Sequence, residues 1–303
     1  MDNVCHSLAG AAIAQTGFAR RLPRATLLAV IAANIPDVDA LTYLGSDNAF
    51  AVSFRRGWTH GIPALVVWSV LLAVVFARWT KRKPLDYLPL AAIAVVSHPS
   101  LDWLNTYGVR FFMPFSNTWY YGDTLFIVDL VLIALFALGW FTSSRLLAAG
   151  NRRAEWPART ALALSLGYIL VMKGMSELTR AAVERQARSP LTRRELMVAP
   201  APFSMTRREI MMRSGPTLYR VRAGWNGLRP ALGTETVSEF TGATPAMYTA
   251  VRATVDGERF LRWARFPYFV PGAGADSNTV FVGDARYSSG TTQSWAGIRV
   301  PLK

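Results

Sequence analysis

The chain has 303 residues, of which 51% are hydrophobic and 17% charged, with 33 Lys and Arg against 19 Asp and Glu. Soluble proteins carry about 25% charged residues, so this composition argues against a single ordinary soluble domain. The only cysteine, Cys5, excludes an intrachain disulfide. Residues 1–180 hold 16 basic and 10 acidic residues and residues 181–303 hold 17 and 9, without a dense basic tract, so we expect no specific nucleic-acid partner.

Residues 1–180 are expected to form a helical membrane domain. Two apolar stretches are long enough to span a bilayer: Gly57–Ala77 contains no charged residue, and Thr124–Ser144 contains only Asp129. Four shorter apolar stretches complete a predicted α-helical multi-pass membrane bundle of about five to six helices: Ser7–Ala19, Ala25–Pro36, Tyr87–Leu101 and Thr160–Met172.

Basic residues gather in alternate turns between these segments. Positions 20–24, 78–83 and 145–159 contain eleven Lys and Arg, whereas the intervening turns contain only Arg55, Arg56 and Arg110. By the positive-inside rule, we expect the basic turns in the cytoplasm. The N-terminus and the loop 105–123 are then expected on the extracytoplasmic side.

Residues 181–303 are expected to form a β-rich extramembrane domain. Thr217–Trp225, Phe260–Val270 and Asn278–Val282 have the composition of strands and are separated by Gly, Pro and Asn clusters. The preceding helix is predicted from Thr160 to about Arg188, and if it spans, the β-rich domain is extracytoplasmic. The alternative is a helix lying along the membrane surface, because Lys173 interrupts its apolar part.

All three histidines occur in the first third of the chain, next to carboxylates and at predicted helix ends. His98 and Asp102 are four residues apart, so on a helix they share a face and can converge on one cation. The candidate groups are His6, Asp37, Asp39, His60, His98, Asp102, Asp123 and Asp129.

We count the residues between each candidate group and the nearest basic turn. Five segments then each place one candidate group at a similar depth in the membrane. At the helical rise per residue, His6, Asp37, His60, His98 and Asp129 lie about 20 to 27 Å from that turn. In a hydrocarbon core about 30 Å thick, this level is near the outer headgroups. Ionisable groups at such a depth are costly and indicate a functional site.

Ordinary structural roles are the alternative for each group taken singly. Asp37, Asp39 or Asp123 could cap a helix, and His60 could be a buried, hydrogen-bonded histidine. A buried cluster of acidic groups without a cation would repel itself, which favours a metal site. Mixed imidazole and carboxylate ligands suit zinc, with manganese or iron as alternatives, and we expect one or two ions, preferring two.

At these residues the chain resembles the YdjM-like family of membrane-bound metal-dependent hydrolases, over roughly its whole length. The resemblance implies a metal-dependent hydrolase in the inner (cytoplasmic) membrane of a bacterium. The matching elements are His6, NIPDVD, RGWTH, HPSLDWLNTYG, PFSNTWYYGD and Asp129.

The order His, Asp, His, HxxxD is more distantly similar to that of zinc-dependent phospholipase C and the single-strand-specific zinc nucleases. If the ligands of those enzymes are transferred to the matching positions, that similarity implies one zinc bound by Asp39 (or Asp37), His60, His98 and Asp102. A second would be bound by His6 and a bridging Asp102. Those enzymes use a later group of two histidines and a glutamate for a further zinc, whereas here no histidine follows His98. Asp123 and Asp129 would substitute in part or support the ligands from outside.

This ligand set predicts hydrolysis by metal-activated water. Asp37 or Asp39, whichever does not bind metal, is expected to act as general base. Arg55 and Arg56 are expected either to hold a substrate phosphate or to anchor the chain at the interface. A site near the headgroups favours a phosphoester of a lipid or lipid-linked substrate, with membrane lipids as partners.

An extracytoplasmic zinc nuclease is the alternative enzyme for this sequence. A non-enzymatic envelope protein with a structural metal is the third interpretation. The sequence leaves the oligomeric state open.

Overall fold

The computed structural model describes residues 1–45, 47–187, 191–192, 195–227, 229–274, 277–288, 292 and 294–301. The chain divides into two compact units, the first made of Met1–Asp39 and Arg56–Gly174 and the second of Ala40–Arg55 and Met175–Lys303. The domain boundary near residue 180 stays a prediction. The boundary between the two compact units, between Gly174 and Met175, falls within the long helix α8 (Trp156–Ala187).

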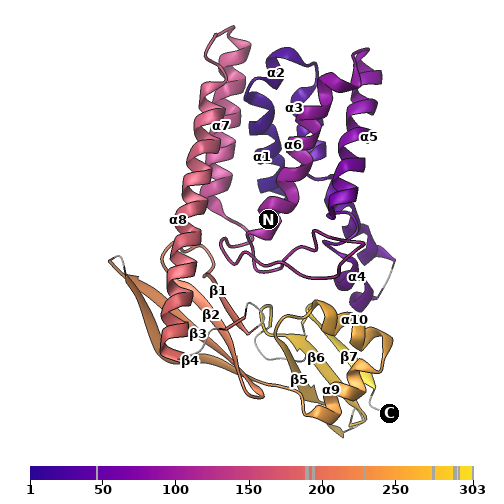
Figure 1. Cartoon of the computed structure of the whole chain (residues 1–303), viewed down its shortest axis with the longest axis vertical. Helices are drawn as coiled ribbons and strands as arrows, with labels where there is room; N and C mark the ends of the chain where they lie inside the picture. Colours follow the sequence, from indigo (N-terminus) through magenta and orange to yellow (C-terminus); the bar gives the residue numbers. More distant parts are fainter. Residues whose placement is uncertain are drawn as a thin grey trace. The chain divides into compact units, whose positions relative to one another are not determined.

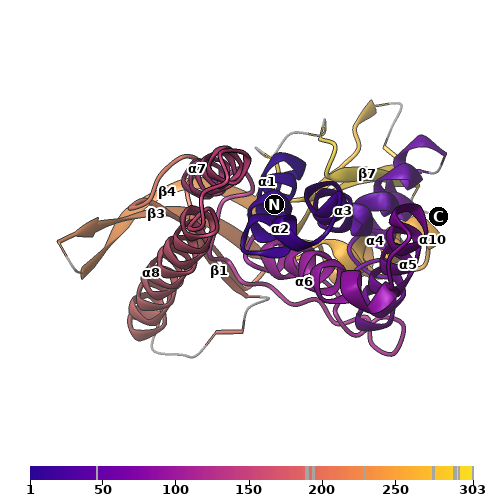
Figure 2. The ribbon, with the colours of Figure 1, turned by 90° about the horizontal axis from the view of Figure 1, so that it is seen from above.

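The first unit is a helical bundle (Figure 1). Helix α1 packs against α3, α6 and α7, and seen from above it lies between α7 and α3 (Figure 2). The helices of this unit, besides the first part of α8, are α1 (Asn3–Gln15), α2 (Phe18–Arg21), α3 (Ala25–Ala32), α5 (Ile62–Thr80), α6 (Pro84–Trp103) and α7 (Leu130–Ala148). The 3-10 helix η1 (Ile35–Leu44) begins in this unit and ends in the second.

Within the described residues, three helices are long and apolar enough to cross a membrane: α5, α7 and α8. Helices α3 and η1, bent by 49° at their junction, would raise the number to four if they form one span. The expectation of about five to six helices in a multi-pass bundle was therefore too high. Helices α1 and α3 have only 13 and 8 residues, and polar groups such as His98 and Asp102 lower the hydropathy of α6.

The two long apolar stretches of the sequence correspond to α5 and α7. Helix α7 begins at Leu130 because Asp129 is its N-cap, with Oδ1 accepting hydrogen bonds from the backbone N–H groups of Val131 and Leu132 at 3.1 Å each. Helix α5 begins at Ile62, after a turn that contains His60.

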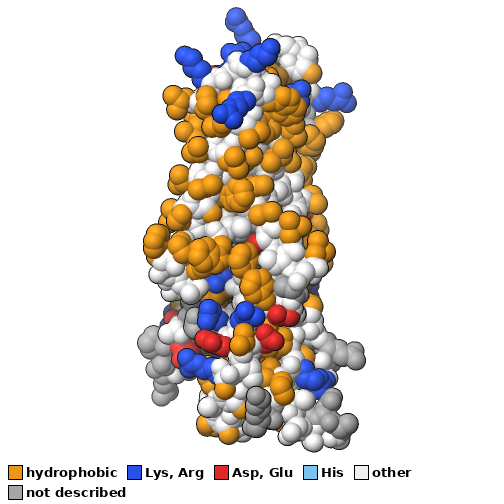
Figure 3. Space-filling view, turned by 90° about the vertical axis from the view of Figure 1, so that its right-hand side faces the viewer, with side chains coloured by type: hydrophobic (Ala, Val, Ile, Leu, Met, Phe, Trp, Pro, Cys, Tyr) orange, Lys and Arg blue, Asp and Glu red, His pale blue; other side chains and the backbone are white. Residues whose placement is uncertain are grey.

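On the face shown in Figure 3, the surface of the helical unit is largely apolar, and Lys and Arg side chains gather at one end of the unit. Contacts made by two arginines hold the basic turns of that end together. Arg20 Nη2 donates to the carbonyl oxygens of Asn151 and Arg152, and the Arg24 guanidinium lies 3.5 Å from the Trp79 ring centroid. The three basic turns thus share one end of the bundle, while its cytoplasmic orientation stays a prediction.

The second unit is rich in β-structure, as expected. The first of its antiparallel sheets has the order β1-β2-β3-β4 and the second has the order β5-β6-β7. The strands are β1 (Leu196–Pro200), β2 (Arg208–Ser214), β3 (Thr217–Asn226), β4 (Arg229–Thr241), β5 (Pro267–Pro271), β6 (Thr279–Asp284) and β7 (Gly297–Pro301). Its short helices are α4 (Asn48–Phe54), α9 (Pro245–Arg252) and α10 (Val255–Trp263), with α4 packed on α10 and β7.

The stretch Phe260–Val270 was expected to be a strand, and its first part is instead the end of α10. Thr254 caps this helix by accepting a hydrogen bond from the Gly257 backbone N–H at 3.1 Å. Phe260 and Trp263, three residues apart, are both fully buried, which is the spacing of a helical face. The aromatic residues that suggested a strand form this buried face.

Helices α7 and α8 approach closely at Gly139, where an added Cβ would lie 2.5 Å from the Ala161 Cβ. We expect Gly139→Ala to destabilise the helical unit by about 1–3 kcal/mol through overpacking. A matched control is Gly167→Ala on α8, where an added Cβ meets nothing within 4 Å. Thermal unfolding in detergent should show a lower midpoint only for Gly139→Ala, and equal midpoints for the two variants would contradict the packing.

Candidate metal centre

Four side chains of the first unit converge at the ends of three elements. Asp37 comes from η1, His60 from the turn before α5, and His98 and Asp102 from α6. One potential ligand atom from each lies within 4.8 Å of all the others. The side chains of His60, His98 and Asp102 are 0% exposed, and that of Asp37 is 9% exposed.

Local sequence explains this convergence. His98 and Asp102 are one helical turn apart, so both project from the same face of α6. His60 lies in a turn flanked by Gly57 and Gly61. A Cβ added to Gly61 would lie 2.5 Å from the Met113 carbonyl oxygen, and one added to Gly57 would collide with the Arg110 guanidinium. The two glycines therefore let the loop 110–113 pack closely against the turn that carries His60.

The distances among the four ligand atoms fit a tetrahedral ion. The Nε2 atoms of His60 and His98 are 3.2 Å apart. Asp37 Oδ1 lies 3.8 Å from the first and 3.7 Å from the second, and Asp102 Oδ2 lies 3.6 and 3.4 Å from them. Tetrahedral zinc with bonds of about 2.0–2.1 Å holds its ligand atoms about 3.3–3.4 Å apart. These five separations each lie within about 0.5 Å of that value.

Hydrogen bonds on the outer side of each imidazole turn Nε2 toward the cluster. His98 Nδ1 donates to the Ala33 carbonyl oxygen at 2.6 Å. His60 Nδ1 lies 2.9 Å from Thr59 Oγ1, and the Thr59 hydroxyl in turn donates to Asp39 Oδ2 at 2.8 Å. Because Nδ1 carries the proton in both rings, each Nε2 presents its lone pair to the centre, as metal-bound histidines do.

The two carboxylate oxygens of Asp102 have different surroundings. Its Oδ1 accepts a hydrogen bond from Arg56 Nη2 at 2.9 Å, lies 3.3 Å from His6 Nε2 and contacts the Met1 amino group. Its Oδ2 faces the two histidines and has no hydrogen-bond partner among the described residues. A buried carboxylate oxygen without a donor is costly, and a cation at the centre would satisfy it. The residues present therefore fit a metal ion.

Asp39 and His6 lie next to the four-residue cluster. Asp39 Oδ2 accepts a hydrogen bond from the Arg56 backbone N–H at 2.8 Å and lies 3.3 Å from His60 Nδ1, on the outer side of that ring. The His6 ring stacks on His98 with centroids 3.8 Å apart, and its Nε2 is directed to Asp102 Oδ1. Direct metal binding by either residue stays a prediction, as does a second ion.

Asp123, Asp129 and Arg55 are not members of this four-residue group. Asp129 caps α7, and its Oδ2 accepts a hydrogen bond from the Tyr168 hydroxyl at 2.9 Å. Asp123 is buried, with a backbone φ of 50°. Arg55 ends α4 in the second unit, with its guanidinium 5.7 Å from the Tyr43 ring centroid. The metal and phosphate roles of these residues stay predictions.

Arg56 is buried in the first unit, and residues to which the sequence gave no separate role hold it in place. Its Nη1 donates to Asn105 Oδ1 at 3.1 Å, and its guanidinium lies 4.5 Å from the Tyr107 ring centroid. Thr59 is a further such residue, linking His60 to Asp39. All three lie within the motifs RGWTH and HPSLDWLNTYG that carry the family resemblance, which was the available signal for them.

Together these observations define a helical membrane protein with a buried His/Asp group that could hold a metal ion. Residues 1–176 match the family described as YdjM inner membrane protein, and the chain belongs to this family. The resemblance to this family is therefore confirmed over residues 1–176, whereas it was expected over roughly the whole chain, and all four cluster residues fall within the matched region.

One curated relative is an uncharacterized protein, YfhP, from Bacillus subtilis (strain 168), which is 31% identical over 127 residues. The alignment covers 39% of this chain and 38% of the relative. The search of solved structures returned no match.

Removing a cluster ligand should remove the metal. We expect His98→Ala and Asp102→Ala, purified in detergent, to lose nearly all the bound metal that elemental mass spectrometry finds in the parent protein. Ser97→Ala is the matched control because Ser97 adjoins His98 and donates its hydroxyl proton to the Ala94 carbonyl oxygen. Equal metal content in His98→Ala and Ser97→Ala would contradict the assigned centre.

Asp39 is expected to tune the metal affinity through His60. Asp39→Asn keeps the shape of the side chain but removes its charge, so we expect affinity to fall about 10- to 100-fold. A competition titration with a chelating indicator measures this change. Asp47→Asn, which alters an N-cap carboxylate of α4, is the control for loss of one negative charge. Unchanged affinity in Asp39→Asn would show that Asp39 does not support the metal centre.

Proposed function

We propose that the protein is a membrane-embedded metal-dependent hydrolase that cleaves a phosphoester of a lipid or lipid-linked substrate. The observation that carries this proposal is the convergence of two imidazole nitrogens and two carboxylate oxygens, one of them the orphaned Asp102 Oδ2. A divalent ion held there would polarise a phosphoryl oxygen and activate water for attack. We propose zinc because two imidazole nitrogens and one carboxylate oxygen, with a fourth position open to water, suit a catalytic zinc ion.

Within this proposal, His60, His98 and Asp102 would hold the ion and leave its fourth position to water, and Asp37 would be the general base for that water. It is the cluster member that reaches the surface, 9% exposed against 0% for the other three, so substrate and water approach from its side. Asp39 is a weaker choice because its Oδ2 already accepts hydrogen bonds from the Arg56 backbone and the Thr59 hydroxyl. That oxygen is therefore already occupied as a hydrogen-bond acceptor. Asp39 accordingly positions His60.

Arg56 is assigned a positioning role. Its guanidinium donates to Asp102 Oδ1 and Asn105 Oδ1, which fixes the Asp102 carboxylate with its other oxygen toward the histidines. The positive charge also offsets part of the negative charge of the cluster.

A lipid substrate is favoured because the centre belongs to the unit that carries membrane-spanning helices. A phosphoester near the headgroup level reaches such a centre while its hydrocarbon tail stays in the bilayer. We further propose that the centre and the β-rich region are extracytoplasmic, which the basic turns at one end of the bundle support.

Hydrolysis can be tested by phosphorus NMR on protein reconstituted with zinc. The substrates are phosphatidic acid, phosphatidylglycerol and an isoprenyl phosphate, each in phosphatidylcholine vesicles. We expect a new phosphorus signal from at least one of them, and Asp37→Asn should lower its rate of formation by about 100-fold or more.

Asp86→Asn, at an exposed site near the start of α6, is the control carboxylate. Turnover in Asp37→Asn equal to that of the parent protein would contradict the assigned base. Absence of lipid hydrolysis together with zinc-dependent loss of single-stranded DNA would replace the proposal by the nuclease.

A further inference from the structure

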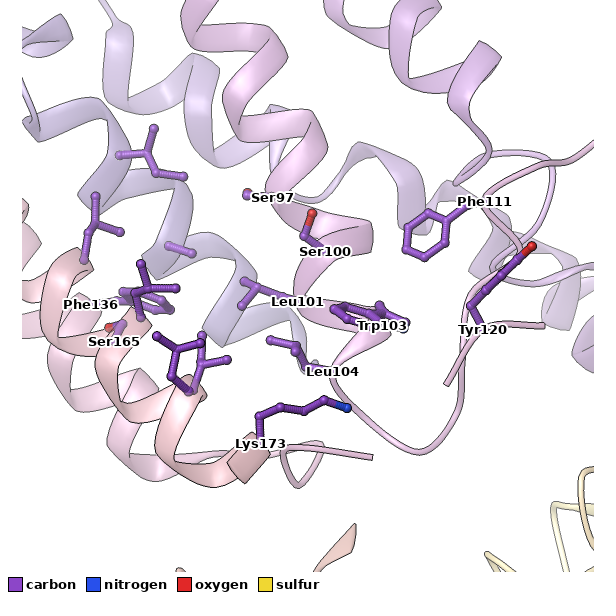
Figure 4. A pocket seen from close by; sticks show the side chains of 16 residues that line it. Ser97, Ser100, Leu101, Trp103, Leu104, Phe111, Tyr120, Phe136, Ser165 and Lys173 are labelled. Carbon is purple, nitrogen blue, oxygen red and sulfur yellow. The ribbon is translucent and has the colours of Figure 1, made fainter. Parts of the chain in front are cut away.

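The first unit contains an apolar cavity of about 750 Å³ bounded by α1, α6, α7 and α8 (Figure 4). This size falls within the range of small-molecule sites. Its walls are almost entirely hydrocarbon, with Leu101 and Trp103 from α6, Phe136 from α7 and Leu166 from α8. Lys173 of α8 is the one charged residue of the lining.

This cavity is separate from the metal centre. With 3.6 residues per turn, Ser100 on α6 lies about 200° around the helix from His98. His98 and Asp102 therefore face the metal centre, whereas Ser100 and Leu104 face the cavity. A ligand in the cavity would contact a different face of α6 from the one that carries the metal ligands.

The cavity opens toward the outside of the bundle. Leu166 and Leu170 line it and are 58% and 62% exposed, and both belong to α8, which has the length and composition of a membrane span. The surroundings of such a face are lipid hydrocarbon. Water gains too few polar partners among these walls, so acyl chains fill the space more favourably.

We propose that the cavity binds an acyl chain of a membrane phospholipid, with the anionic phosphate of that lipid at Lys173. Lys173 Nζ donates to the Gly122 carbonyl oxygen at 3.2 Å and lies 5.9 Å from the Trp103 ring centroid, where α6 ends. Lys and Trp side chains characteristically meet at the headgroup level of a bilayer. The charge thus lies at the end of the cavity where a headgroup would be, and attracts a phosphate.

Native mass spectrometry of the detergent-purified full chain tests this site. The protein is stripped of lipid and then incubated with phosphatidylglycerol or phosphatidylcholine. We expect one retained phospholipid per chain, with phosphatidylglycerol bound more tightly. Filling the cavity with Ser100→Trp should weaken retention by at least about tenfold. Lys173→Gln should retain a lipid but lose the preference for phosphatidylglycerol.

Val67→Trp is the matched control, because Val67 is 60% exposed on α5 and does not line the cavity. Equal retention in Ser100→Trp and Val67→Trp would overturn the proposal. The parent protein could also prove to be a dimer that Ser100→Trp converts to a monomer without changing lipid retention. That result would assign the cavity to a second copy of the chain and would also overturn the proposal.

Metal content and thermal unfolding of each variant check that it folds, and Leu170→Trp replaces Ser100→Trp if that variant does not. The measurement counts intact lipid by mass, and cleavage at the metal centre would appear as a change in lipid mass, so loss of retention and failure of the proposed enzymatic activity are distinguishable.

Discussion

The buried carboxylate of Asp102 is the group on which the arrangement of the helical unit depends. Full burial removes its hydration, so each oxygen needs a positive or proton-donating partner. Arg56 supplies that partner for Oδ1, and Oδ2 faces the Nε2 atoms of His60 and His98. A cation between these groups would give Oδ2 the positive partner that it needs. The ends of η1, α5 and α6 meet at that point.

Support from outside the cluster makes the centre rigid. The Ala33 carbonyl fixes one imidazole, and the chain from Thr59 to Asp39 fixes the other, so both rings turn the same atom inward. Metal sites depend on such outer hydrogen bonds nearly as much as on the ligands themselves. The family match over residues 1–176 includes the cluster and its supports, and it leaves out most of the β-rich second unit.

Much of this organisation could be read from sequence, because hydropathy and i, i+4 spacing are local properties. Hydropathy predicted the helices α5 and α7, and the i, i+4 spacing predicted that His98 and Asp102 share a face of one helix. Local sequence could not decide which of Asp37 and Asp39 joins the cluster, because the 3-10 geometry of η1 determines which carboxylate faces the His60 and His98 Nε2 atoms. The partners of Arg56 and the helical state of α10 likewise depend on tertiary contacts.

The central claim is that two imidazoles and two carboxylates surround one metal ion. X-ray absorption at the zinc edge of the purified, zinc-loaded protein tests it most directly. We expect about four nitrogen and oxygen neighbours at about 2.0–2.1 Å, with the multiple-scattering signature of two imidazole rings. A spectrum showing a sulfur neighbour, or no imidazole scattering at all, would contradict it.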